Sequence, residues 1–295
     1  MKKNFWLLLG LGVLFGVVFG FVLAKNTSPI SKEDVKSAQK LFNLEFNETE
    51  IDTMLSYLAD NRTGYDCMRT FSLDNNIAPA ISFDPYPMDL EIVPSKGLHV
   101  WQVDENVKLP KDRVEIAFLS IRELAGLIKS RQISSVELTK IYLERIKKYD
   151  PKLQAFISVT EDLAMSQAQK ADEEIASGNY KGPLHGIPYG IKDLAAVPDY
   201  PTTWGAAPYK DQVINETATV AKKLEEAGAV LLGKLVSGSL ARGDVWFGGK
   251  TKNPWDLTQG ATGSSAGSGS ATSAGLVAFS IGTETLGSII SPSTR

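Results

Sequence analysis

Cysteine and histidine are scarce in this chain of 295 residues. Cys67 is the single cysteine, and the two histidines are His99 and His185. A single cysteine excludes an internal disulfide, and so few thiol and imidazole ligands argue against a metal site. Positive charge is not in excess either, because 31 Lys and Arg stand against 34 Asp and Glu. This balance argues against a nucleic-acid partner, and no motif indicates a cofactor.

The composition is that of a globular protein, with 43% hydrophobic and 22% charged residues. A chain of this length suits one large or two modest domains. We expect three segments: residues 1–26 as a membrane anchor or signal segment, residues 27–118 as a helical and irregular extension, and residues 119–295 as the main domain.

The N-terminal stretch at residues 5–24 carries no charge and matches the length of about 20 residues that a membrane-spanning helix needs. Lys2 and Lys3 precede it, so the positive-inside rule places the N-terminus in the cytoplasm and the rest of the chain outside. Small residues at positions 22–24 keep a cleaved signal, and hence a secreted or periplasmic protein, as the alternative. Glycines at 12, 16 and 20 form one face that would allow two such helices to pair in a homodimer.

The rest of the chain shows alternating helix and strand patterns. Residues 28–70 read as helical, with N-cap pairs at Ser31/Asp34 and Asn47/Glu50. The proline-rich stretch at 73–118 reads as irregular. Capping boxes at Ser120/Glu123 and Ser134/Glu137 predict helices near 121–131 and 135–149. A further helix is expected to end at Gly178 and another to span 217–227, with strands at 153–159, 187–191 and 229–232. This alternation predicts an α/β fold in which helices cover a mixed β-sheet.

Two serines and one lysine stand in unusual surroundings. Ser264 lies in the run GSSAGSGS at 263–270, Ser288 in GTETLGSI at 282–289, and Lys192 ends the apolar stretch GIPYGIKD at 186–193. A lysine can activate a serine if burial lowers its pKa. The alternative for Lys192 is a strand-end residue that reaches solvent or pairs with Asp193.

The Gly/Ser run admits three interpretations. It lacks the Gly-Lys-Ser/Thr ending of a phosphate-binding loop. It matches G-x-S-x-G with Ser265 at the centre, but that motif needs a preceding strand and a later histidine, whereas a loop-like sequence precedes it and no histidine follows. A flexible linker is disfavoured because the apolar residues at 271–281 indicate a buried helix and strand.

These segments together resemble the amidase signature family. The resemblance covers residues 120–295 and rests on GPLHGIP at 182–188 leading to IKD at 191–193, GK at 233–234, NPWD at 253–256, the Gly/Ser run, and residues 282–292. Their order and separations are similar to those of the family.

The resemblance implies roles for individual residues. Ser288 would be the acylating nucleophile, Ser264 the relay serine held after Gly263 by a cis peptide bond, and Lys192 the buried base, neutral near pH 7. The backbone N–H groups of Thr285, Leu286, Gly287 and Ser288 would form an oxyanion hole. Ser265, Asp193 and Glu284 would lie next to the catalytic residues and hold them in place without reacting themselves.

Three positions depart from the usual pattern of the family. Leu286 stands where glycine is common, Ile290 where arginine is common, and Glu284 where aspartate is usual. This variant is similar to the peptide-amidase branch. Since the family's domain continues beyond residue 295, we also expect the chain to be the N-terminal part of a longer protein, and to be weakly stable and poorly active alone.

The leading functional hypothesis is hydrolysis of a carboxylic amide C–N bond, of a small molecule or a peptide, through a serine acyl-enzyme outside the cytoplasmic membrane. One alternative is the glutamine-hydrolysing A-type subunit of an amidotransferase, which shares the signature. The other is a membrane-tethered, non-catalytic pseudoenzyme or binding protein.

Overall fold

The computed structural model describes residues 29–74, 77, 80 and 103–295, and the chain divides into two compact units at residues 94 and 95. The predicted domain boundary at residue 118 lies later than this division. Ile116 and Ala117 are buried in the core of the second unit. In the part of the chain that the structure describes, no helix is long and apolar enough to cross a membrane. The span predicted at residues 5–24 lies outside the described residues.

The first unit contains two helices, α2 (Lys32–Phe42) and α3 (Glu48–Met68). Both begin at the predicted N-cap residues, since Ser31 and Asn47 each complete a capping box with the acidic residue three positions later. Lys32 and Lys36 of α2 form ion pairs with Glu48 and Asp52 of α3. These ion pairs are exposed and stabilise only weakly, whereas Val35 of α2 and Ile51 of α3 are buried apolar residues.

The second unit is an α/β domain, as predicted. Its helices are α4 (Arg113–Ile116), α5 (Ile121–Lys129), α6 (Ser135–Leu153), α7 (Glu161–Ala176), α8 (Thr219–Glu226), α9 (Ala266–Ser273) and α10 (Ile290–Ser293). Its strands are β1 (Phe156–Val159), β2 (Pro188–Lys192), β3 (Val230–Leu235), β4 (Val245–Trp246), β5 (Gly249–Lys250) and β6 (Phe279–Ile281), with short 3-10 turns at Ala207–Tyr209 and Ser239–Ala241. Helix α4 lies in the stretch predicted to be irregular. The Asp112 side chain caps its start by accepting the Val114 N–H.

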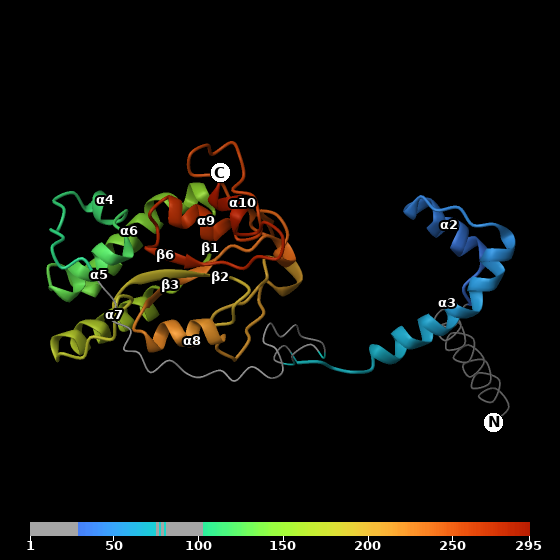
Figure 1. Cartoon of the computed structure of the whole chain (residues 1–295), viewed down its shortest axis with the longest axis horizontal. Helices are drawn as coiled ribbons and strands as arrows, with labels where there is room; N and C mark the ends of the chain where they lie inside the picture. Colours follow the sequence, from blue (N-terminus) through green and yellow to red (C-terminus); the bar gives the residue numbers. More distant parts are fainter. Residues whose placement is uncertain (1–28, 75–76, 78–79, 81–102) are drawn as a thin grey trace, which may run out of the picture. The chain divides into compact units, whose positions relative to one another are not determined.

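The main sheet has the strand order β1-β3-β2-β6. Strand β2 runs parallel to β3 and β6, whereas β1 pairs antiparallel with β3. Helices α6 and α9 cover one face and α8 the other (Figure 1). Both faces of β2 and β3 are therefore buried, which explains their nearly continuous apolar sequence.

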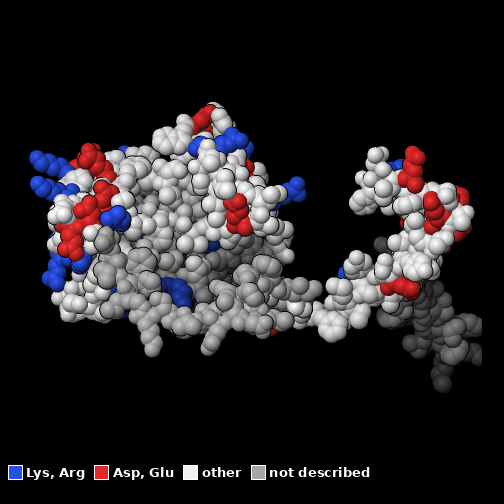
Figure 2. Space-filling model, viewed as in Figure 1, with Lys and Arg blue, Asp and Glu red and all other residues white. Residues whose placement is uncertain are grey.

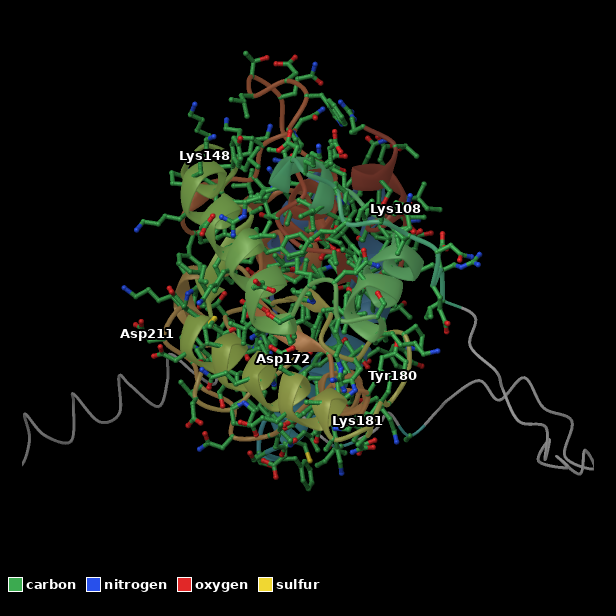
Figure 3. All side chains as sticks on the ribbon, turned by 90° about the vertical axis from the view of Figure 1, so that its left-hand side faces the viewer. Lys108, Lys148, Asp172, Tyr180, Lys181 and Asp211 are labelled. Carbon is green, nitrogen blue, oxygen red and sulfur yellow. The ribbon has the colours of Figure 1, made fainter. Side chains whose placement is uncertain are left out.

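Helix α6 is fixed at its start by α7. The Asp172 carboxylate on α7 accepts the backbone N–H groups of Ser135, at 2.7 Å, and Val136, at 3.1 Å; Asp172 is labelled in Figure 3. A carboxylate at a helix N-terminus satisfies free N–H groups and favours the helix dipole. The predicted capping boxes Ser120/Glu123 and Ser134/Glu137 are confirmed as hydrogen-bonded pairs.

Charged side chains of both signs lie close together over the end of this domain that carries α4, α5 and α6 (Figure 2). Arg113 pairs with Glu144, and Lys129 pairs with Glu105. Such exposed pairs contribute at most about 1 kcal/mol each. The core supplies far more, because burying one large apolar side chain is worth about 1.5–3 kcal/mol, and Leu124, Leu127, Leu138 and Leu232 are fully buried.

Candidate active site

The candidate site lies where parallel strands end. Lys192 is the last residue of β2, and Thr283 follows the end of β6 by two positions. Ser264 and Ser265 directly precede α9, which packs against β2, β3 and β6. Because parallel strands present their carboxyl ends at one edge of the sheet, residues distant in sequence meet there.

Three side chains of this edge surround the Lys192 amine. Its Nζ lies 2.7 Å from Ser264 Oγ, 3.0 Å from Ser265 Oγ and 2.9 Å from Thr283 Oγ1. The Thr283 carbonyl oxygen lies at 3.3 Å. A neutral amine has one lone pair and two N–H donors, so it can accept the Ser264 proton while donating to two other oxygens.

Burial changes the acidity of this lysine. Lys192 is 1% exposed, and desolvation lowers its pKa from 10.5 to about 8. At pH 7 the protonated form still predominates, so the expectation of a neutral amine at that pH is too strong. The neutral form predominates only above about pH 8. The alternative of a solvent-exposed lysine is wrong.

The turn before α9 differs from the one expected. The peptide bond between Gly263 and Ser264 is trans, not cis. The chain reverses instead through left-handed backbone conformations at Thr262, with φ 63°, and Gly263, with φ 59°. These two residues provide the sharp turn while the peptide keeps its favoured geometry.

The backbone of Ser288 packs against this turn. The Ser265 N–H donates to the Ser288 carbonyl oxygen at 3.0 Å, and a Cβ added at Gly263 would lie 3.0 Å from the same oxygen. The Ser288 side chain is half-buried, and its hydroxyl makes no hydrogen bond with any of the described residues. The structure thus brings Lys192 and Ser264 into direct contact and places Ser288 beside them without a hydroxyl-to-hydroxyl bond.

Glu284 organises the loop that carries Ser288. Its carboxylate accepts the N–H groups of Gly287 at 3.1 Å, Ile289 at 2.6 Å and Ile290 at 2.8 Å. These bonds hold the pKa of Glu284 below its usual range, with the Ile290 N–H as the largest cause.

The oxyanion hole assigned to Thr285, Leu286, Gly287 and Ser288 stays a prediction. The Gly287 N–H is occupied by Glu284, so it could serve only after that bond breaks. The Leu286 side chain is 93% exposed.

Asp193 does not contact the Lys192 amine but pairs with Lys234 of β3, Nζ to Oδ1 2.7 Å, and both side chains are fully buried. The pairing of Asp193 with Lys192, one alternative above, is therefore wrong, because neighbouring residues at a strand end point to opposite sides.

Two residues of the site were missed by sequence reasoning. Lys234 stands in the GK motif at 233–234, and Thr283 directly precedes Glu284, so both lay inside segments already recognised.

Histidine is not part of this arrangement. His185 Nδ1 accepts the Lys181 N–H at 3.1 Å, and its Nε2 lies 3.0 Å from the Glu174 carboxylate. The nucleophile-elbow interpretation of Ser265 also lacks its strand, since turns occupy residues 253–264 apart from isolated bridges. Ser265 instead hydrogen-bonds to Lys192 and Thr283.

A family model for amidases matches residues 137–294, more than half of the chain. The chain therefore belongs to the amidase family. The AmiD protein of Mycobacterium tuberculosis, a putative amidase by its name, is 42% identical over 188 residues, which cover 62% of this chain and 39% of that protein. The A subunit of the glutamyl-tRNA(Gln) amidotransferase of Thermoanaerobacter pseudethanolicus is 41% identical over 184 residues, covering 61% of this chain and 38% of that protein.

The fold is likewise similar to that of solved amidases. The peptide amidase of Stenotrophomonas maltophilia superimposes with a TM-score of 0.55 at 35% identity, covering 59% of this chain and 37% of that one. The chain thus spans well under half of the length of the relatives that it matches.

Proposed function

We propose that the protein hydrolyses the C–N bond of a carboxylic amide through a serine acyl-enzyme. The contact of 2.7 Å between the Lys192 amine and Ser264 Oγ, inside a buried environment, carries this proposal. A desolvated lysine with a lowered pKa is a competent base, and its direct partners are hydroxyls and one carbonyl. Membership of the amidase family supports the same chemistry.

The proposed reaction is a two-step acyl transfer. The neutral Lys192 amine takes the proton of Ser264, Ser264 takes the proton of Ser288, and Ser288 Oγ attacks the amide carbonyl carbon. Backbone N–H groups of the Ser288 loop stabilise the resulting oxyanion. The C–N bond breaks as Ser264 gives a proton to the leaving amine and recovers one from the Lys192 ammonium. Water then gives a proton to Ser264 and Lys192 and attacks the serine ester, and the relay returns that proton to Ser288 Oγ as the carboxylic acid leaves.

The relay needs a change at Ser288, because its hydroxyl is not bonded to Ser264 in this structure. The two serines lie on adjoining backbone segments, linked by the Ser265 N–H to Ser288 O bond. A rotation of the Ser288 side chain, or a small shift of its loop, is the motion required. A cavity of about 430 Å³ beside Ser265, Gly282 and Ile289 offers room for a small-molecule or peptide amide.

Labelling with a fluorophosphonate tests the nucleophile. We expect the probe to label the wild-type protein and Ser265→Ala, and to label neither Ser288→Ala nor Lys192→Met. Ser177→Ala is a matched control that should label normally, because Ser177 is exposed after the end of α7 and does not line the cavity beside Ser265. Loss of labelling in Ser265→Ala with retention in Ser288→Ala would overturn the assignment of Ser288, and absence of labelling in every form would favour the non-catalytic alternative.

The similarity to an amidotransferase subunit favours one second candidate, release of ammonia from glutamine. Ammonia release from glutamine and from a peptide C-terminal amide, measured on the same preparation, separates the two functions. We expect turnover of the C-terminal amide, because the sequence at 284–290 is similar to the peptide-amidase branch. Turnover of glutamine alone would support the amidotransferase function.

We also infer that the catalytic region lies outside the cytoplasmic membrane, anchored by residues 5–24. The uncharged run and the preceding lysines support this location. After washing with carbonate, the protein should remain in the membrane pellet. Recovery of a soluble form that begins near Lys25 would indicate a cleaved signal.

A further inference from the structure

A cavity of about 490 Å³ lies on the face of the sheet that carries α8. Helices α7 and α8, strands β2 and β3, and the loop after β2 contribute to its wall. Tyr189 of β2 lines it, whereas Lys192, three positions later, points to the opposite side toward α9. The cavity is therefore separate from the Lys192–Ser264 centre.

Carboxylates surround this cavity. Asp162, Asp199 and Glu225 are exposed, come from three different elements and line it together. None of the three forms an ion pair or a side-chain hydrogen bond with another described residue, and no lysine or arginine of the described chain lines the cavity. The wall thus has an uncompensated negative charge.

Two tyrosines lie among these carboxylates. Burial is the largest cause that raises the pKa of Tyr200, and the carboxylates of Asp162 and Asp199 raise it further. Burial is likewise the largest cause that raises the pKa of Tyr189, and the carboxylate of Glu225 adds to it. The negative charges therefore act on the same space that the phenol rings border, and an aromatic face next to carboxylates attracts cations.

The Tyr189 side chain gives an independent indication of a ligand. It is 2% exposed and stacks on Phe279, with ring centroids 5.3 Å apart. Its hydroxyl has no hydrogen-bond partner within the described part of the chain. The hydroxyl oxygen keeps some accessible surface, and the side chain lines the cavity, so a polar group that enters the cavity meets an acceptor that no described residue occupies.

The spread of the carboxylates decides the kind of cation. Within the described residues, no three His, Cys, Asp or Glu side chains converge closely enough to hold a metal ion. Charges distributed around a cavity of this volume, with Leu163, Val197 and Leu231 in the wall, suit a ligand with an apolar body and one cationic end.

We propose that this cavity binds an organic cation, a primary ammonium or guanidinium compound with an apolar body. The cation lies among Asp162, Asp199 and Glu225, donates to the Tyr189 hydroxyl oxygen, and contacts the tyrosine rings with its apolar part. Binding does not depend on the amidase activity proposed above, so it is measured on the inactive Ser288→Ala protein as well as on the wild type.

Calorimetric titration with 2-phenylethylamine tests this proposal, with the neutral 2-phenylethanol and the anionic 3-phenylpropionate as matched ligands. We expect saturable binding of the amine alone, in both the wild-type and the Ser288→Ala chain. The affinity should fall with added salt, since partly exposed charges are screened. Equal binding of the three compounds, or no saturable binding of the amine, would overturn the proposal.

Variants locate the binding site. Glu225→Gln and Asp199→Asn should each weaken binding of the amine about tenfold, and Tyr189→Phe severalfold. Glu173→Gln, which removes a carboxylate of α7 outside the cavity, should leave the affinity unchanged. Glu225 and Asp199 are surface residues, so their variants remain folded, and a thermal unfolding curve checks this. Unchanged affinity in Glu225→Gln and Asp199→Asn would overturn the proposal, whatever the outcome for Tyr189→Phe.

Discussion

Lys234 and Asp193 form a fully buried ion pair directly behind the candidate site, with Nζ 2.7 Å from Oδ1. Asp193 Oδ1 has no hydrogen bond of normal geometry, so the contact with Lys234 is chiefly one of charge. The same Nζ donates to the Pro201 carbonyl and to Thr202 Oγ1, each at 3.0 Å. The Thr203 N–H donates to Asp193 Oδ2 at 2.8 Å. The pair therefore joins the ends of β2 and β3 to the loop at 201–203 and fixes the strand end that carries Lys192.

Asp193→Asn should destabilise the protein strongly, because it leaves the buried Lys234 charge without its counter-charge. Breaking one partner of such a pair costs about 3–5 kcal/mol. The measurement is the free energy of unfolding from urea titration. Asp211→Asn is the control, because Asp211 is 88% exposed and lies 4.0 Å from Lys210, and exposed pairs of this kind contribute at most about 1 kcal/mol. Similar losses in both variants would contradict a structural role for the buried pair.

Amide hydrolysis should depend on the neutral form of Lys192. With a pKa lowered to about 8, kcat/KM should rise with pH and level off above that value. Lys192→Met should remove most of the turnover at every pH. A profile that is flat between about pH 6 and 9, at wild-type rates, would contradict the role of Lys192 as the base.

The same lysine should make stability depend on pH. Its pKa is about 8 in the folded protein, against 10.5 for an unperturbed lysine, so between these values the unfolded chain binds more protons and stability rises with pH. Relative to Lys192→Met, the wild-type free energy of unfolding should increase by about 3 kcal/mol across that window. Comparing the two proteins cancels the titration of other groups. A difference that stays constant with pH would show that the pKa of Lys192 is not lowered.

Local features of the fold could be predicted from the sequence because they rest on contacts between near neighbours. The capping boxes at Ser120/Glu123 and Ser134/Glu137 fix helix starts through residues three positions apart, and both are present. The alternation of helix and strand patterns was likewise enough for the α/β class.

The site was harder to predict, since its contacts cross long sequence separations. Local patterns could not bring Lys192 to Ser264, 72 positions away, and only the family resemblance did so. Nothing local distinguished Asp193 as the partner of Lys234 rather than of Lys192, because that choice depends on the parallel pairing of β2 with β3. The trans bond before Ser264 was missed because backbone dihedrals at Thr262 and Gly263 are set by the packing around them.

Glu284 should order the loop of Ser288 through its three backbone acceptor contacts. In Glu284→Ala, the amide hydrogens of Gly287, Ile289 and Ile290 should exchange faster with solvent than in the wild type. Since its pKa is lowered in the folded state, this ordering is present above the ordinary pKa of glutamate and is lost as the pH falls through the lowered value. Glu216→Ala, which removes another exposed carboxylate, should leave these amides unchanged. Equal exchange in Glu284→Ala and the wild type near neutral pH would contradict this role.

Gly263→Ala should disturb the turn more than an ordinary glycine replacement does. Gly263 has φ 59°, and an added Cβ would lie 2.6 Å from Pro292 Cδ and 3.0 Å from the Ser288 carbonyl oxygen. Gly178 is the matched control, because it has φ 87° but nothing lies within 4 Å of its added Cβ. Both variants suffer the strain of a left-handed alanine, about 1–2 kcal/mol, whereas only Gly263→Ala adds a clash, worth about 1–3 kcal/mol more.

The unfolding free energies of the two variants separate strain from crowding, and amide hydrolysis adds a second measurement. Because the clash pushes on the backbone of Ser288, Gly263→Ala should lower kcat by about 10- to 100-fold, while Gly178→Ala should leave it near the wild-type value. Equal stability losses together with normal turnover in both variants would mean that the Ser288 loop does not depend on its close approach to Gly263.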